Sequence, residues 1–252
     1  MQEKKYEGIG NKKLFSINKW KSMILVIVIL VFFESFLERD KEELNSVVRF
    51  ALGFVGFQNR GIFFSSIVKF LLPQLGFLLV WGNYFDENIR KNISIIFTRT
   101  QDSKKIVWKY TKELVMGMFF SVAMFEIGVC LIYYMKGYRS GDVYSLLIDL
   151  MLYTLYMIMA LVITNVLSFY CKSIYSVWLV LFLQVLSLEC IYSILDKTEQ
   201  VCYYIPISVI LLVQNTDIDS ARKIGWCISI MVIMAVSIMV AGQTAKKQLK
   251  KI

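Results

Sequence analysis

Five ionisable side chains stand inside long apolar runs and are the residues best placed to do chemistry. They are Glu34, Lys69, Glu126, Asp149 and Glu189. A charge at the centre of a bilayer costs about 2.5–3.5 kcal/mol on insertion scales, so we expect these residues to line a substrate pathway. Four carboxylates against one lysine would favour a cationic, amphipathic ligand. The alternative is that all but Glu126 lie close enough to the outer interface to reach water or to pair with one another.

Glu126 stands near the middle of its apolar run, where neither interface is easily reached. This position favours a functional charge over a solvated one. A structural role is the alternative: a hydrogen bond to a neighbouring helix, for which Thr154 and Gln184 are candidates.

Much other chemistry is excluded by what the sequence lacks. The chain has no histidine, so it cannot build a Ser-His couple, a Cys-His couple or a His-ligated zinc site by itself. No C-x-x-C motif occurs among its cysteines, which argues against a redox or metal motif. We expect free thiols, although a disulfide among Cys190, Cys202 and Cys227 remains open. An intramembrane enzyme would need Ser-Lys or carboxylate chemistry, and no serine is tied to Lys69 by its spacing.

Nucleotide binding is also not expected of this chain. A phosphate-binding loop requires G-x-x-x-x-G-K-[ST], which holds phosphates with backbone N–H groups and a lysine. The nearest stretch, residues 8–12, has the wrong spacing. We therefore predict that the chain binds no ATP, Mg²⁺ or other cofactor and is not itself an enzyme.

The composition predicts an all-α membrane protein. Of 252 residues, 57% are apolar and 19% are charged, and the mean hydropathy is +0.59. Soluble domains have about 45–50% apolar and about 25% charged residues. A helix needs about 20 apolar residues to cross a bilayer. Six runs approach this length, at residues 22–37, 62–84, 114–134, 144–169, 174–195 and 224–241.

Lysine and arginine predict the orientation. The segments that flank the predicted spans form two groups. One group, at residues 1–21, 85–113, 170–173 and 242–252, holds 18 Lys and Arg, and the other, at residues 38–61, 135–143 and 196–223, holds 9. The positive-inside rule places the first group, with both termini, in the cytoplasm. The net charge of +9 is thus explained by topology, and we predict no nucleic-acid partner.

Three segments should lie outside the bilayer core. Residues 9–21 predict an amphipathic helix in the inner interface, or a plain basic flank. Residues 202–215 are apolar but too short to cross, so we expect an outer non-spanning segment. Residues 85–113 form a charged cytoplasmic hairpin, far longer than a simple helix connection of about 2–8 residues. It should dock a partner, unless it is only a solvated basic face.

This layout resembles the ABC type-2 exporter permeases. In that family the hairpin after the second span carries an acidic residue near the membrane, then a short apolar helix, a small-basic pair and a lysine. Here Asp86 or Glu87 stands at the acidic position, Ser103-Lys104 at the pair, and Lys112 at the lysine. The resemblance covers the whole chain by layout, but its motifs are loose.

The resemblance implies that residues 89–99 form a coupling helix. The glycine that commonly follows the acid in the family is absent, and Arg90 or Asn92 stands in its place. The residues expected to couple to the ATPase are Asp86, Glu87, Arg90, Ile95, Ile96, Phe97, Arg99, Lys104 and Lys105.

By resemblance, the chain is a permease subunit that exports amphipathic or cationic peptides such as bacteriocins, lantibiotics or toxins from a bacterial cytoplasmic membrane. Its partners would be two copies of an ATP-binding subunit, which holds ATP and Mg²⁺, and a second permease copy, identical or paralogous. The alternative is a stand-alone membrane immunity protein that binds a toxin or lipid, with its basic hairpin on anionic lipid.

Overall fold

The computed structural model describes residues 17–35, 44–52, 60–90, 103–139, 143–195 and 220–249. Within these ranges the chain is helical and contains no strand, as predicted. The helices are α1 (Ile17–Ser35), α2 (Leu44–Ala51), α3 (Arg60–Trp81), the π-helical turn η2 (Asp86–Arg90), α5 (Ser103–Met135), α6 (Val143–Leu167), α7 (Ser173–Leu195) and α10 (Ser220–Leu249).

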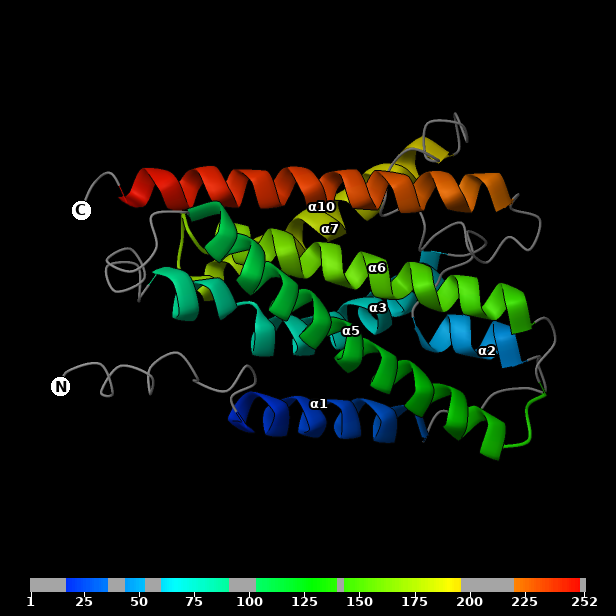
Figure 1. Cartoon of the computed structure of the whole chain (residues 1–252). Coiled ribbons are helices and arrows are strands. Elements are labelled where there is room, and N and C mark those ends of the chain that lie inside the picture. The colour runs from blue at the N-terminus through cyan, green and yellow to red at the C-terminus, as the bar shows by residue number, and fades with distance from the viewer. Residues whose placement is uncertain are drawn as a thin grey trace.

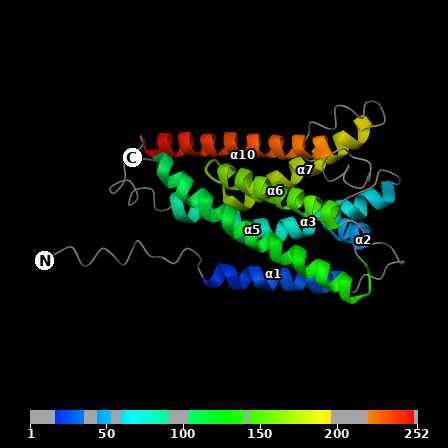
Figure 2. The same ribbon diagram turned by 45° about the vertical axis from the view of Figure 1, so that its right-hand side comes forward.

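The long helices form one bundle with two distinct ends (Figure 1). α1 begins, α3 ends, α5 begins and α10 ends at the same end, which we call the termini end. The short helix α2 lies at the opposite end, which we call the α2 end. α5 crosses the bundle obliquely and contacts α10 on one side and α1 on the other, an arrangement seen in both views (Figure 2).

Five of the described helices are long and apolar enough to cross a membrane. They cover Ile67–Ile89, Val107–Met135, Val143–Leu167, Ser173–Cys190 and Gly225–Thr244. The multi-pass membrane character is therefore confirmed. α1, at 19 residues, is not among the five, so the count of six spans stays a prediction.

Some boundaries differ from the predicted ones. Residues 103–113, which we assigned to the hairpin, belong to the single 33-residue helix α5. No Pro or helix-breaking turn signal separates Ser103 from Met135, so one helix can continue through both parts. In the predicted interfacial helix 9–21, residues 17–21 begin α1, while residues 9–16 lie outside the described ranges. The predicted outer segment 202–215 also lies outside them.

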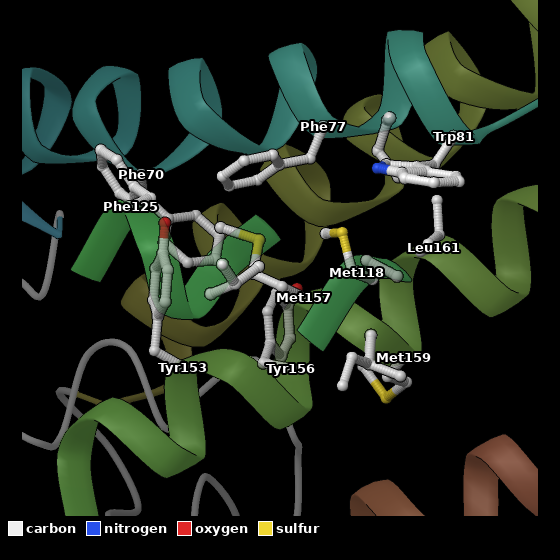
Figure 3. Packing of buried hydrophobic residues seen from close by; sticks show 14 of the residues in the cluster. Phe70, Phe77, Trp81, Met118, Phe125, Tyr153, Tyr156, Met157, Met159 and Leu161 are labelled. Carbon is white, nitrogen blue, oxygen red and sulfur yellow. The ribbon is translucent and has the colours of Figure 1, made fainter. Parts of the chain in front are cut away.

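An aromatic core joins α3 to α5 and α6 (Figure 3). The Phe70 and Tyr153 ring centroids lie 6.0 Å apart, nearly perpendicular, and those of Phe77 and Phe125 lie 5.9 Å apart. Edge-to-face pairs of this kind add about 0.5–1.5 kcal/mol beyond their buried area.

α1 approaches its neighbours through glycines. A Cβ on Gly76 of α3 would lie 2.7 Å from the Cγ1 of Val26, and one on Gly128 of α5 would lie 2.8 Å from the Cγ2 of Val31. Lipid tails are as apolar as leucine, so membrane helices associate through such close packing rather than through hydrophobic burial. The two glycines therefore fix the position of α1.

We predict that Gly128→Leu pushes α1 away from α5 and lowers stability by about 1–3 kcal/mol, the usual cost of overpacking. Thermal unfolding of the purified protein in mild detergent measures this. Gly225→Leu on α10 is the matched control, because a Cβ at Gly225 meets nothing within 4 Å. Equal stability of the two variants would contradict the packing assignment.

Candidate functional site

A groove of about 650 Å³ opens between α5 and α6 toward the α2 end. Its walls are almost entirely apolar, and many of its side chains are half exposed or more. The lining residues are Leu44, Phe119, Ala123, Glu126, Ile127, Cys130, Leu131, Tyr134, Leu147, Leu150, Met151, Thr154, Leu155 and Ile158.

Glu126 is the acidic residue of this groove. Its side chain lies on α5, and the Thr154 hydroxyl on α6 donates a hydrogen bond of 2.9 Å to its Oε1 atom. The residue is only 7% exposed. Of the two partners considered from the sequence, Thr154 is the one that the structure shows. Within the described part of the chain, this hydroxyl is the only hydrogen-bond partner of the Glu126 carboxylate.

The other four predicted pathway residues lie elsewhere. Glu34 is buried between α1 and α5, where the Tyr133 hydroxyl donates a 2.9 Å hydrogen bond to its Oε2 atom. Lys69 is half-buried on α3, and Glu189 is exposed on α7. Asp149 is buried on α6 at the α2 end. Of the five, only Glu126 lines the groove.

Asp149 forms an ion pair that the sequence did not reveal. The Arg49 guanidinium of α2 donates from Nε to Oδ2 of Asp149 at 2.6 Å, and its Nη2 donates to the Ser145 hydroxyl at 2.8 Å. Both charged residues are under 10% exposed. The arginine lies on an eight-residue amphipathic helix whose apolar residues Val47 and Val48 are fully buried. The ion pair thus holds α2 against the first turns of α6.

A second polar cluster lies at the termini end, where the predicted hairpin begins. Lys19 of α1 forms an ion pair of 2.7 Å with Oε2 of Glu87 and donates a 3.0 Å hydrogen bond to Oδ1 of Asn83. The Asn83 amide donates to the other Glu87 oxygen at 2.7 Å. On α5, Glu113 accepts a 2.7 Å hydrogen bond from the Tyr84 hydroxyl. These contacts connect α1 and α5 to the residues that follow α3.

Asn165 holds the chain where α3 ends. Its Nδ2 atom donates to the Trp81 carbonyl at 3.0 Å, and its Oδ1 atom accepts from the Phe85 N–H at 2.9 Å. In an uninterrupted helix these two backbone groups would bond to each other. The Asn165 amide, fully buried on α6, stands between them and satisfies both. It therefore stabilises the turn that leads from α3 into η2.

The predicted coupling residues are only partly described. Asp86 and Glu87 are half-buried in η2, which ends at Arg90. Lys104 and Lys105 lie in the first turn of α5, with Lys105 exposed. Ile95, Ile96, Phe97 and Arg99 lie outside the described residues.

Among the described residues, no group of three or more His, Cys, Asp or Glu side chains could hold a metal ion. Comparison with protein families, with curated proteins and with solved structures finds no match to this chain.

We predict that Asp149→Asn lowers stability by about 3–5 kcal/mol, because it leaves the Arg49 charge buried without its counter-charge. Thermal unfolding in detergent measures the loss. The matched control Glu189→Gln removes an exposed carboxylate and should change stability by less than about 0.5 kcal/mol. A loss no larger than that of the control would show that the pair is not needed.

We predict that Asn165→Leu lowers stability by about 1–3 kcal/mol, because the Trp81 carbonyl and the Phe85 N–H lose their partner inside the bundle. Hydrogen exchange read by mass spectrometry should increase first in peptides that contain residues 82–90. Ser187→Ala is the control, since it removes only a hydrogen bond within α7. Unchanged exchange in residues 82–90 would refute the role of Asn165.

Proposed function

We propose that this chain is the permease subunit of an ATP-driven ABC exporter that moves amphipathic or cationic peptides. In this proposal ATP is hydrolysed by a separate subunit, present in two copies, that docks on the 85–113 hairpin. A second permease copy completes the transporter in a bacterial cytoplasmic membrane, with the termini end in the cytoplasm.

The observation that carries the proposal is the length of α5. A helix of 33 residues is about 50 Å long at about 1.5 Å per residue, while the hydrocarbon core of a bilayer is about 30 Å thick. Part of α5 must therefore extend beyond the core. Its first turns carry Lys105, Lys109 and Lys112, all exposed, so the extension lies at the termini end.

The same helix also carries Glu126. Any displacement of the basic extension by a docked ATPase would therefore be transmitted along continuous helix to the groove. Two contacts support this role. Tyr84 bonds to Glu113 and so joins the residues that follow α3 to α5, and Lys19 joins α1 to Glu87 in the same segment. A rigid element between a docking surface and a membrane groove is what a transporter driven by a separate motor requires.

We predict that the tagged chain, purified in mild detergent, brings down a P-loop ATPase at one copy per permease. The double charge reversal Lys105→Glu with Lys109→Glu should lower this recovery several-fold, because it removes two exposed positive charges from the docking surface. Arg139→Glu is the control, since Arg139 is an exposed cation at the α2 end.

Recovery of an equal amount of ATPase with the double reversal would refute the docking surface. Absence of any ATPase from the folded, wild-type chain would refute the exporter itself. The stand-alone immunity protein, with the α5 lysines on anionic lipid, would then become the better proposal.

A further inference from the structure

We infer that the groove between α5 and α6 binds an amphipathic peptide through one cationic side chain that pairs with Glu126. The inference rests on the proposed function, to which it adds a substrate class and a binding site. Three features of the groove carry it: its shape, its one acidic residue and the depth of that residue.

The shape fits an elongated apolar ligand. The groove follows α5 from Phe119 to Tyr134, a distance of about 22 Å at about 1.5 Å per residue. A volume of about 650 Å³ is within the range of about 300–1,000 Å³ typical of ligand sites. Met151, 65% exposed on the α6 wall, supplies an adaptable contact. Side chains on one face of a helix could occupy such a groove, as in other helix-in-groove complexes.

The charge of Glu126 identifies the polar part of the ligand. The two other buried carboxylates have their own partners within the bundle: Asp149 pairs with Arg49, and Glu34 bonds to Tyr133. Glu126 instead lines the groove, and within the described residues only a neutral hydroxyl bonds to it. A ligand cation placed in the groove would supply the counter-charge that the described residues do not provide there.

The depth of Glu126 favours a peptide over a lipid headgroup. It stands nine residues before the end of α5 at Met135, which corresponds to about 14 Å, near the middle of a hydrocarbon core about 30 Å thick. A lipid carries its amine at the headgroup level and would not bring it to this depth. A helical peptide lying along the groove can place a lysine beside Glu126, with the apolar stem of the lysine against the apolar walls.

The test is a binding measurement on the full-length chain in lipid nanodiscs, without an ATPase. One probe is a labelled helical peptide of leucine and alanine, about 15 residues long to match the groove, with a single lysine at its centre. The second probe has glutamine in place of that lysine. We expect the lysine peptide to bind at least about tenfold more tightly, in line with measured couplings of close charge pairs.

Glu126→Gln should abolish this preference while keeping an acceptor for the Thr154 hydroxyl. Glu189→Gln removes an exposed carboxylate from α7 and should keep the preference intact. A preference that survives Glu126→Gln, or that is absent from the wild-type chain, overturns the inference. The wild-type comparison of the two peptides decides the matter even if Glu126→Gln fails to fold.

A second pair of variants locates the site. Ala123→Phe places a ring in the groove beside Glu126 and should weaken binding of the lysine peptide at least about tenfold, as expected for loss of a well-filled pocket. Val232→Phe places the same ring at an exposed position on α10, which is outside the groove, and should leave binding unchanged. Equal effects of the two variants would contradict the assignment to the groove.

These outcomes separate the inference from the exporter proposal. If an ATPase copurifies but the chain binds both peptides equally, the exporter proposal stands and the groove is not its peptide site. If the groove prefers the lysine peptide but no ATPase copurifies, the peptide site stands and the chain is better described as a toxin-binding immunity protein.

Discussion

Hydrogen bonding of the backbone where α3 stops constrains the rest of this structure. Lipid provides no partner for an exposed N–H or C=O group, so a helix can end inside a membrane bundle only where another group replaces the lost bond. The Asn165 side chain does this by bonding both the Trp81 carbonyl and the Phe85 N–H. The chain can therefore leave α3 and enter η2 while still packed against α6. The start of the charged hairpin is fixed by that one buried amide.

The helix α5 runs from one end of the bundle to the other. Near the termini end it receives the Tyr84 contact through Glu113, and it presents exposed lysines in its first turns. Further along, it packs against α1 at Gly128 and carries Glu126 into the groove. All these residues belong to one continuous helix. The proposed coupling between an ATPase and a peptide depends on this continuity.

Much of the fold follows from the sequence, because apolar length is a strong signal in a membrane protein. The apolar runs that contain α3, α5, α6, α7 and α10 are all long apolar helices, as predicted. The hydrogen bond between Glu126 and Thr154 is one of the two that the sequence suggested for Glu126. Both residues stand inside spans, where a polar side chain has few possible hydrogen-bond partners.

The contacts that the sequence missed join segments far apart in the chain. Arg49 stands in a charged segment outside the predicted spans, and nothing in its spacing indicates a buried partner one hundred residues later. Asn165 is a single amide within an apolar run, and its partners lie about eighty residues earlier, where α3 ends. The helix α5 also begins before the predicted span, at Ser103, because a hydropathy boundary marks the edge of the bilayer and not the end of a helix. Tertiary packing decides the contacts of Arg49 and Asn165.

The most direct measurement is ATP hydrolysis by the purified complex in nanodiscs, with and without the lysine peptide, for the wild-type chain and for Glu126→Gln. If the α5–α6 groove receives the peptide and α5 transmits its presence to the ATPase, the lysine peptide should stimulate hydrolysis in the wild-type complex. The same peptide should have little effect on hydrolysis by the Glu126→Gln complex, measured relative to that complex without the peptide. Equal stimulation of both complexes, or none in the wild-type complex, would contradict this account.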